Sequence, residues 1–427
     1  MHNIIKNYKN LAKDKKRKDI LSIIEAGLHS IQPIEVLEKN ISLKENILSI
    51  KNKKYDISKY KRIYILGIGK GSADIVEILN KRLNGLITSG DVIDLISKEM
   101  KNIKVTKGDH PLPTKTNLDF TKRVIEKYSQ LKDTDLVITV ICGGGSALFE
   151  YPNKISNDLL IDISKVMLTS GVPIEEMNTI RKHLSKVKGG QLAELIYPAK
   201  IISLIFSDIP GNDLSFIASG PTVKDQTTVS NAIAIVNKFK IQSKLNIDLS
   251  VFKETPKNEK YFKNVSNILM LSNITALNAM YKKAIKLGYN SKIFSDRVQM
   301  EARELGEYLI KKTDHNTVLL GGGESVVTVH GNGKGGRSQE ASLASYKYVG
   351  SDTVFISIGT DGWDNSDFAG GIMDDITIQK ANKLGLVFDD YINNDNSYNF
   401  FKKTGDAIIT GKLPSNVSDL MIVLKRR

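Results

Sequence analysis

Cysteine is almost absent from this chain. Cys142 is the one cysteine among 427 residues, so no intramolecular disulfide and no cysteine-based zinc cage can form. It stands in the stretch ICGGG at 141–145, directly before a run of glycines. We expect a small buried residue that ends a core strand, and a reactive thiol is the alternative interpretation.

Long hydrophobic runs are absent as well. Hydrophobic residues make up 41% and charged residues 25% of the chain, and the longest apolar runs have the length of a strand. A membrane-spanning helix would need roughly 18 consecutive apolar residues. Residues 1–19 lack the apolar stretch and the small-residue cleavage site of a secretory signal. We therefore expect a cytoplasmic enzyme without a membrane segment.

Acidic residues are in the minority. The chain has 61 Lys and Arg against 47 Asp and Glu, and its formal net charge is +14. Residues 1–62 hold 15 Lys and Arg and 7 Asp and Glu, which accounts for +8 of the excess. A basic arm for nucleic acid is one interpretation. However, Ile20, Ile23, Ile24 and Leu28 follow helical spacing and few aromatic residues are present to stack on bases. We expect a solvated helix face, no nucleic-acid partner, and a surplus of positive charge that suits anionic small substrates.

What the chain does contain is an alternation of apolar strands with amphipathic helices. Such an alternation predicts an α/β fold with parallel sheets covered on both faces. The expected strands are 63–68, 136–142, 200–206, 267–271, 317–320 and 353–358. The expected helices are 72–83, 117–131, 158–170, 275–287 and 298–311. A hairpin-like piece at 324–336 interrupts the alternation, and the polar, Lys-rich residues 240–263 suggest a domain boundary.

Five of the expected strands end in glycine next to a polar or charged side chain. Ligands of open parallel sheets bind beyond the carboxyl ends of the strands, so the five ends together indicate a binding site, although each alone would suggest only a turn. They are GIGKGS at 67–72, GGGS at 143–146, SDIPGND at 207–213, GGGE at 321–324 and GTDG at 359–362. The two runs of three glycines suggest two similarly built ligand loops.

Three functions compete for these glycine runs. A nucleophile elbow needs glycine two residues after the serine, but Leu148 occupies that position after Ser146. A dinucleotide fingerprint matches once, at 331–336 (GNGKGG), with an expected strand at 325–329 before it and a helix after it; a lone match of this kind is weak. A loop that wraps phosphate groups fits better, because three glycines let backbone N–H groups converge on an anion.

Charged residues near the glycines favour phosphoryl transfer. Lys70, Lys334 and Arg337 supply cations, and Asp208 and Asp361 are candidate ligands for Mg²⁺. The Lys70 stretch is not a Walker A loop, because Tyr64 stands where that motif requires its first glycine. The residues therefore indicate phosphoryl transfer on a scaffold other than a P-loop.

The string of motifs resembles the class II glycerate kinases, the family with a C-terminal MOFRL domain. The matching stretches occur in the family's order and span most of the chain. They are LGIGKGSAD (66–74), GDHPLPTKTN (108–117), ICGGGSALF (141–149), MNTIRKHLSKVKGGQLA (177–193), FSDIPGNDLSFIASGPT (206–222), GGGESVVTVHGNGKGGRSQE (321–340) and GTDGWDNSDFAGGIMD (359–374). One departure lies at 411–416, where GKLPSN replaces the family's usual GPTGTN turn.

The resemblance implies both a fold and a reaction. It implies a Rossmann-like N-terminal domain with a parallel sheet (residues 1–245), a smaller α/β C-terminal domain (264–427, with the MOFRL region at about 315–425), and an active site in the interdomain cleft. It implies ATP-dependent phosphorylation of D-glycerate with Mg²⁺. Archaeal members make 2-phosphoglycerate in the non-phosphorylative Entner–Doudoroff route, and others are assigned 3-phosphoglycerate.

We expect 2-phosphoglycerate as the product and keep two alternatives, the same kinase forming 3-phosphoglycerate and an NAD(P)-dependent hydroxyacid reductase. A homodimer is left open as the assembly. The motifs and the resemblance together give the expected site. Lys70, Arg337 and Asp361 are expected to be catalytic, and Lys70, His110, Arg181 and Arg337 to bind substrate. Asp208 and Asp361 are expected to hold the metal. The nucleotide and its phosphates are expected at Gly143, Gly144, Gly145, Ser146, Lys186, Gly211, Asn212, Ser219 and Gly220.

Overall fold

The contacts within the protein define two compact units. The computed structural model describes residues 3–209, 211 and 213–426. Unit 1 combines Met1–Val36, Asp208–Gly211 and Leu271–Arg427, and unit 2 combines Leu37–Ser207 and Asn212–Met270. This division differs from the boundaries expected from the sequence, since it keeps residues 240–263 inside unit 2 and joins the first 36 residues to the C-terminal part.

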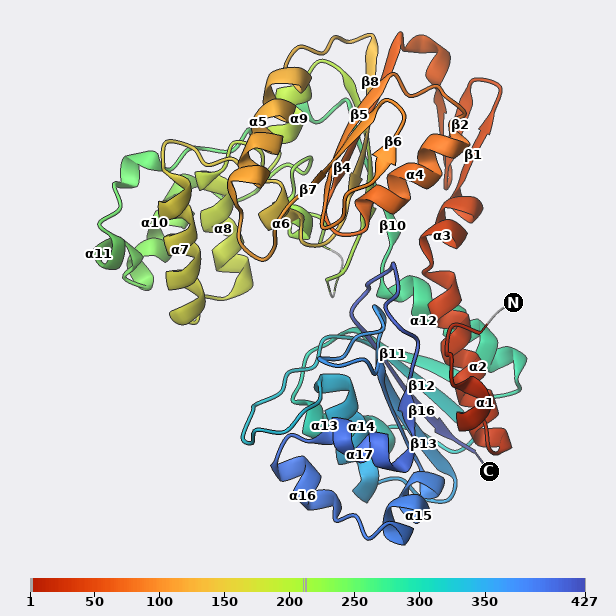
Figure 1. Cartoon of the computed structure of the whole chain (residues 1–427). Coiled ribbons are helices and arrows are strands. Elements are labelled where there is room, and N and C mark those ends of the chain that lie inside the picture. The colour runs from red at the N-terminus through yellow and green to blue at the C-terminus, as the bar shows by residue number, and fades with distance from the viewer. Residues whose placement is uncertain (1–2, 210, 212, 427) are drawn as a thin grey trace. The chain divides into compact units, whose positions relative to one another are not determined.

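Unit 2 is built on a mostly parallel sheet (Figure 1). Its strand order is β10-β9-β8-β4-β5-β7-β6; β4 pairs in parallel with β5 and β8, β5 with β7, and β8 with β9, while β6 runs antiparallel to β7. The strands are β4 (Arg62–Ile68), β5 (Ser89–Asp94), β6 (Glu99–Met100), β7 (Ile103–Lys107), β8 (Asp135–Ile141), β9 (Lys200–Phe206) and β10 (Val265–Leu271). A separate antiparallel sheet holds β1 (Ile41–Lys44), β2 (Ile47–Ile50) and β3 (Lys53–Asp56).

The central strands are apolar because both faces of this sheet are covered. Every residue of β8, DLVITVI, is buried, as parallel strands between layers of helices require. Helices α5 (Lys115–Tyr128) and α9 (Gln191–Ile196) pack on the sheet through Phe120, Val124 and Leu192. Omitting the short β6, the order is that of doubly wound sheets, in which the chain reverses direction across the sheet between β4 and β8.

The remaining helices of unit 2 complete its layers. Helix α4 (Ser72–Arg82) follows β4, and the short α6 (Gly145–Leu148) follows β8. A helical cluster with its own apolar core is formed by α7 (Asn157–Thr169), α8 (Ile174–Leu184), α10 (Val229–Lys238) and α11 (Ile241–Leu245). Helix α8 carries a basic last turn with Arg181 and Lys182.

Unit 1 holds a mixed sheet of strand order β11-β12-β16-β13-β14-β15. Only β11 and β12 pair in parallel; the other neighbours among the described strands are antiparallel. The strands are β11 (Asn290–Val298), β12 (Thr317–Gly323), β13 (Thr353–Gly359), β14 (Gly370–Met373), β15 (Ala407–Ile408) and β16 (Asp419–Lys425). The helices after α11 are α12 (Asn273–Lys286), α13 (Ala302–Lys311), α14 (Arg337–Ala344), α15 (Asp375–Lys383), α16 (Phe388–Asn393) and α17 (Ser397–Thr404).

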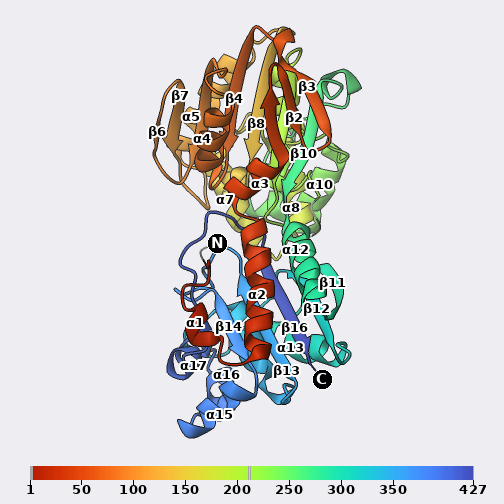
Figure 2. The same cartoon turned by 90° about the vertical axis from the view of Figure 1, so that its right-hand side faces the viewer.

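The N-terminal helices belong to unit 1 because α2 packs against helix α12 of that unit. Besides α1 (Tyr8–Leu11) and the start of α3 (Pro33–Asn40), unit 1 takes in α2 (Lys15–Ser30), which lies along α12 in Figures 1 and 2. The expected apolar face of α2 is confirmed, since Ile20, Ile24 and Leu28 are fully buried. Arg17 is also fully buried and forms ion pairs with Asp374 and Asp406, each at 2.6 Å.

The structure corrects two sequence expectations around the glycine motifs. Residues 324–336 form no hairpin and 325–329 no strand; Val326 makes a single bridge to Glu301, and Val329 is 71% exposed. The second glycine run, Gly321–Gly323, is no loop: it lies inside β12 and pairs with β16. The other expected strands and the helices lie within about four residues of the expected bounds, and Cys142 is buried as predicted.

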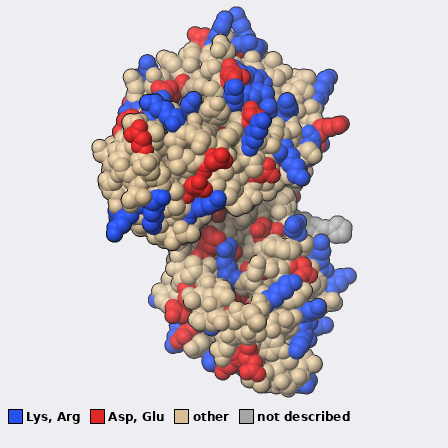
Figure 3. Space-filling view, turned by 60° about the vertical axis from the view of Figure 1, so that its left-hand side comes forward, with Lys and Arg blue, Asp and Glu red and all other residues tan. Residues whose placement is uncertain are grey.

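On the face drawn in Figure 3, Lys and Arg are interspersed with Asp and Glu rather than gathered in one stripe. Among the described residues no single helix is long and apolar enough to cross a membrane. The bent pair α2 and α3 passes on length and composition alone, and the apolar residues of α2 are buried in the protein.

Candidate functional site

In unit 2 two loops meet where the chain reverses direction across the sheet. We call them the switch-point loops: Gly69–Gly71 after β4, and Cys142–Ser146 after β8. The Lys70 N–H donates to the Gly143 carbonyl at 2.9 Å. Gly69 has φ +105°, and a Cβ there would lie 2.5 Å from the Cys142 carbonyl oxygen. Glycine is therefore required for this close approach, and the two loops form one surface at the edge where doubly wound sheets bind ligands.

The Lys70 side chain lies over the second loop. A Cβ on Gly144 would be 2.8 Å from Lys70 Cε and 3.2 Å from His110 Cδ2, so both side chains flank this glycine. Lys70 is exposed and forms no ion pair with any described residue. Burial and the Lys70 charge lower the pKa of His110, which favours the neutral imidazole. The helix α4 that follows is already capped, because the Asp94 carboxylate accepts from the N–H groups of Gly71 and Ala73.

A third segment brings Ser219 and Gly220 to the same place. Ser146 Oγ and Ser219 Oγ are 2.9 Å apart, and Ser219 Oγ donates to Asn178 Oδ1 at 2.9 Å. Ala218 and Ser219 both adopt left-handed backbone conformations, with φ +50° and +59°. Such conformations are uncommon for residues other than glycine and cluster at functional sites. The structure therefore places Ser146 beside Ser219, with Gly220 next in the chain; their role in binding a nucleotide stays a prediction.

Of the basic residues at the end of α8 and just after it, some are paired with a carboxylate and others are not. Lys188 is fully buried, and its Nζ lies 2.5 Å from Glu150 Oε2, whose other carboxylate oxygen accepts from Ser185. The Arg181 side chain has no hydrogen bond or ion pair with the described residues, and burial lowers its pKa. Lys186 is exposed and lies 5.0 Å from the Tyr151 ring centroid. Sequence reasoning singled out Lys186 and missed Lys188, although both stand in the stretch KVKGG.

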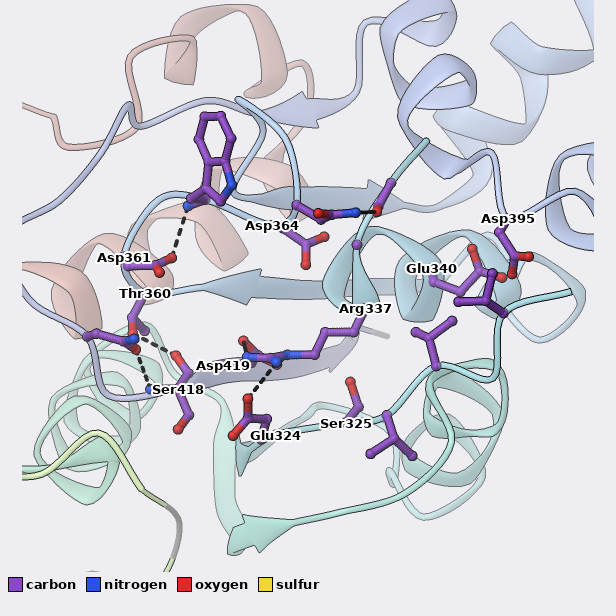
Figure 4. A pocket seen from close by; sticks show the side chains of 18 of the residues that line it. Glu324, Ser325, Arg337, Glu340, Thr360, Asp361, Asp364, Asp395, Ser418 and Asp419 are labelled. Carbon is purple, nitrogen blue, oxygen red and sulfur yellow. Dashed lines mark hydrogen bonds and ion pairs between the residues drawn. The ribbon is translucent and has the colours of Figure 1, made fainter. Parts of the chain in front are cut away.

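Unit 1 contains a pocket of about 700 Å³ around Arg337, which we call the Arg337 pocket (Figure 4). Its lining comes from the segment after β12, the start of α14, the turn after β13 and the start of β16. The lining residues are Glu324, Ser325, Val326, Val327, Val329, Gly333, Gly335, Gly336, Arg337, Glu340, Thr360, Asp361, Trp363, Asp364, Asn365, Asp395, Asn416, Ser418 and Asp419.

Arg337 enters this pocket already paired with two carboxylates. Its Nε and Nη2 donate to Asp419 at 2.6 and 3.1 Å, and its Nη1 donates to Glu324 at 2.6 Å. The N-terminus of α14 is occupied as well, since the Asp364 carboxylate accepts from the N–H groups of Ser338 and Gln339. These carboxylates offset the unfavourable placement of a cation at a helix N-terminus.

Two carboxyl groups of the Arg337 pocket titrate far from their ordinary range. Burial raises the pKa of Asp419 to about 7, although the Arg337 guanidinium opposes this rise. Burial likewise raises the pKa of Glu340 to about 7, against the effect of Arg303, whose Nε donates to it at 2.8 Å. Perturbed carboxyl groups of this kind are concentrated at functional sites.

Three other predicted residues, Asp361, Asp208 and Gly211, also belong to unit 1. Asp361 lines it, and its Oδ1 accepts from the Trp363 N–H at 3.0 Å. Asp208 and Gly211 belong to unit 1, where the Asp208 carbonyl accepts from Ser418 Oγ at 2.7 Å and the Gly211 carbonyl accepts from Arg297 at 3.3 Å. Asn212 lies outside the described residues. Within residues 3–209, 211 and 213–426, no group of three or more His, Cys, Asp or Glu is arranged to hold a metal ion.

The divergent loop at 411–416 contacts the same pocket. The Leu413 N–H donates to the Asp361 carbonyl at 2.8 Å, and Asn416 is part of the lining. Lys412 Nζ lies 5.0 Å from the centroid of the Trp363 ring. The loop thus retains a place at the pocket despite its departure from the GPTGTN pattern.

Comparisons with known proteins match this architecture. Residues 19–252 match the family described as "Domain of unknown function (DUF4147)", and residues 317–419 match the MOFRL family. The chain is 34% identical to the D-glycerate 2-kinase of Thermotoga maritima over 92% of this chain and 97% of that protein. It is 32% identical to a "Putative hydroxypyruvate reductase" of Agrobacterium vitis, over 85% of this chain and 87% of that protein.

A solved structure is similar over nearly its full length. The crystal structure of glycerate kinase from Thermotoga maritima superposes with a TM-score of 0.85 at 31% identity, covering 96% of this chain and 99% of that chain. At this coverage both units of the chain have counterparts in a single known protein.

Proposed function

This chain belongs to the glycerate kinase family, in which a DUF4147 domain is joined to a MOFRL domain, and from that premise we propose that it transfers the γ-phosphoryl group of ATP to D-glycerate. The observation that carries the proposal is the meeting of the switch-point loops, where glycine backbone and an unpaired Lys70 share one surface. Converging backbone N–H groups and a lysine are what a polyphosphate requires.

The residues for ATP are proposed accordingly. Gly144 fits the role, because any Cβ there would fill the space over which Lys70 and His110 lie. Ser219 gives its one hydroxyl proton to Asn178 Oδ1, so Ser146 is the proposed donor, and its hydroxyl would turn from Ser219 Oγ to a phosphate oxygen. The proposed set for the nucleotide and its phosphates is Gly143, Gly144, Gly145, Ser146, Lys186, Gly211, Asn212, Ser219 and Gly220.

The two proposed catalytic cations act by neutralising charge. Phosphoryl transfer passes through a loose transition state, so positioning and charge neutralisation matter more than a strong base. Lys70 is exposed and unpaired among the described residues, so its ammonium is free for a phosphoryl oxygen. Arg337 retains two of its five N–H donors after the three bonds to Asp419 and Glu324. Arg181 and His110 are proposed contacts of the substrate.

Magnesium is proposed at Asp208 and Asp361. Their carboxylate oxygens are suitable ligands, and Mg²⁺ usually completes its shell with water and substrate phosphates rather than with a full set of protein groups. The ion would supply charge neutralisation on the phosphates. Asp361 also lines the Arg337 pocket, and we propose that its carboxylate accepts the hydroxyl proton of the acceptor substrate.

We propose 2-phosphoglycerate as the product, supported by the name of the Thermotoga maritima relative, a D-glycerate 2-kinase. Purified protein incubated with ATP, Mg²⁺ and D-glycerate should release ADP, and phosphorus NMR should show the phosphate ester at carbon 2. Coupling to enolase without phosphoglycerate mutase gives the same answer by absorbance. Activity that appears only after mutase is added would identify 3-phosphoglycerate instead.

A hydroxyacid reductase is the second candidate, favoured by the name of the Agrobacterium vitis relative. The local structure offers it little support. The glycines at 331–336 are not preceded by a strand, whereas a dinucleotide fingerprint requires a strand, the glycine turn and a helix in succession. Oxidation of NADH or NADPH by hydroxypyruvate in the absence of ATP would establish the reductase.

A further inference from the structure

Lys188 is the most completely buried lysine of unit 2, and the proposed reaction gives it no role. Its exposed fraction is 0%, and Nζ contacts Glu150 Oε2 and, at 3.1 Å, the Phe149 carbonyl. Burying an ammonium is costly unless it is paired and hydrogen-bonded. A group placed at such cost beside a ligand loop calls for an explanation.

The contacts of Lys188 form part of a closed ring. Phe149 and Glu150 directly follow α6, the helix that carries Ser146. On the other side of Lys188, the N–H of Gly189 donates to the Ser219 carbonyl at 2.9 Å and that of Gly190 to the Gly220 carbonyl at 2.8 Å.

The hydroxyl groups of Ser146 and Ser219 close this ring at 2.9 Å. Every link of the ring is therefore a hydrogen bond, an ion pair or a covalent connection.

The ring also holds an unfavourable backbone in place. Ser219 lies in the left-handed region at φ +59°, as does Ala218 before it. Such residues persist only where their surroundings determine them strongly. The bonds from the segment after Lys188 to the Ser219 and Gly220 carbonyls supply that constraint, and Lys188 anchors the segment to the other loop.

The pairing has a second consequence, for Arg181. Both carboxylate oxygens of Glu150 are engaged, one by Lys188 and the other by Ser185 at 2.7 Å. Burial lowers the pKa of Arg181 and the Glu150 charge opposes this, but the described structure shows no hydrogen bond or ion pair between the two side chains. The three charges Glu150, Lys188 and Arg181 therefore leave one positive charge uncompensated, which an anionic ligand would balance.

We propose that Lys188 is a positioning residue of the phosphate site, whose pair with Glu150 closes the ring that fixes Ser146 and Ser219. The proposal rests on the assignment of the switch-point loops to ATP phosphates under the proposed function. It makes Lys188 act through the two serines, without touching the ligand itself.

The variants separate positioning from mere stability. Lys188→Met leaves Glu150 buried without a partner and should lower the melting temperature. The double variant Lys188→Met with Glu150→Gln removes both charges and should regain most of that loss, but it does not restore the side-chain link of the ring; the Lys186 N–H bond to the Tyr151 carbonyl at 2.9 Å remains in both variants. A matched control is Arg62→Met with Asp135→Asn. It removes an ion pair of 2.7 Å between the first residues of β4 and β8, at the strand ends away from the switch-point loops.

The measurements are the melting temperature and the affinity for tripolyphosphate and for ATP by titration calorimetry, without an acceptor. We expect both Lys188 variants to bind these probes at least tenfold more weakly, and the control to bind like the wild type. Lys188→Arg, which keeps the charge, should recover part of the affinity. A double variant that regains stability and affinity together would overturn the proposal, even if the single variant fails to fold.

The outcome is distinguishable from a failure of the proposed function. A wild-type protein that binds ATP but does not phosphorylate D-glycerate contradicts the proposed reaction, while the comparison of affinities still tests Lys188. A wild-type protein that binds neither tripolyphosphate nor ATP overturns the phosphate assignment of the ring and this proposal with it.

Discussion

The two runs of three glycines look alike in sequence and serve opposite purposes. Gly143–Gly145 leave the sheet and form a loop, where Gly144 has φ +74° and lies under the Lys70 side chain. Gly321–Gly323 remain inside β12, where a Cβ on Gly322 would lie 3.2 Å from Asn273 and Leu277 of α12. In the first run the missing side chain of Gly144 leaves the space over which Lys70 and His110 lie, where we propose the phosphates. In the second the missing side chains let a helix approach the strand.

The cations near the two runs differ in the same way. Lys70 is exposed and has no ion pair in the described part of the chain, whereas Arg337 is braced by Asp419 and Glu324. A lysine side chain without an ion pair can change its conformation to reach a ligand, whereas the two ion pairs of Arg337 hold its side chain in one position. Replacing each cation should therefore have different effects on the folded state.

The largest expected effect is on catalysis. Lys70→Ala and Arg337→Ala should each lower kcat by roughly two to three orders of magnitude, about 3–4 kcal/mol, as expected for the loss of one charge contact in the transition state. Lys70→Ala should leave the melting temperature unchanged. Arg337→Ala should also lose about 3–5 kcal/mol of stability, because the buried Asp419 loses its partner.

Two further variants test that interpretation. Arg337→Ala with Asp419→Asn should regain stability without regaining kcat. Lys81→Ala, which removes an exposed lysine paired with Glu77, should behave like the wild type. If either single variant keeps more than about a tenth of the wild-type kcat, a span well inside the expected loss, its catalytic assignment is wrong.

The second prediction concerns how the stability of the protein depends on pH through Glu340 of the Arg337 pocket. Glu340 has a folded-state pKa of about 7 against an ordinary value of 4.5. Between these values the folded state holds a proton that the unfolded state releases. The stabilisation is therefore complete below pH 4.5 and is lost as the pH rises to about 7, on the order of 3 kcal/mol in total.

Glu340→Gln mimics the protonated carboxyl and should remove this dependence. Denaturant unfolding at pH 4.5 and at pH 7.5 should show the wild type losing stability relative to the variant as the pH rises. Glu307→Gln, a change on the surface of α13, serves as the control and should show no such loss. Parallel curves for the wild type and Glu340→Gln would mean that Glu340 is not buried as described.

The third prediction sets the two glycine runs against each other. Gly144→Ala places a methyl group at φ +74° and 2.8 Å from Lys70 Cε, and Gly322→Ala places one against α12. Each should cost about 1 kcal/mol of stability. Only Gly144→Ala should weaken tripolyphosphate binding by tenfold or more, measured by calorimetry. Equal losses of binding in both variants would erase the distinction between loop and strand.

The sequence predicted the fold well where periodicity decides it. The stretch at 136–142, apolar except for Thr139 and rich in β-branched residues, predicted a strand buried on both faces, and β8 covers 135–141. The hairpin at 324–336 was wrong because alternating Val and polar residues resemble a strand even where no neighbouring strand is available. The glycines at 321–323 were misplaced because glycine signals a turn and a close approach equally well.

The site was predictable only as far as local motifs reach. Lys70, Ser146 and Ser219 stand in recognisable stretches, and the structure brings their segments together. The pairing of Arg337 with Asp419, 82 positions away, has no signal in one sequence. Lys188 was overlooked for a different reason, since burial cannot be read from a short basic stretch in which Lys186 and Lys188 are two residues apart.

The smallest expected effect comes from the divergent loop. Lys412 Nζ lies 5.0 Å from the Trp363 ring, and Trp363 is 47% exposed. An exposed cation–π contact is worth about 0.5–1 kcal/mol, so Lys412→Ala should change kcat and KM by less than about fivefold. Trp363 is the one tryptophan of the chain, and its emission should shift when Lys412 is removed. Lys402→Ala, which removes a lysine 5.8 Å from the Tyr398 ring, should leave the emission unchanged. A fall in kcat beyond tenfold would instead make Lys412 a contact of the ligand, and an unchanged emission would show that the loop does not lie against Trp363.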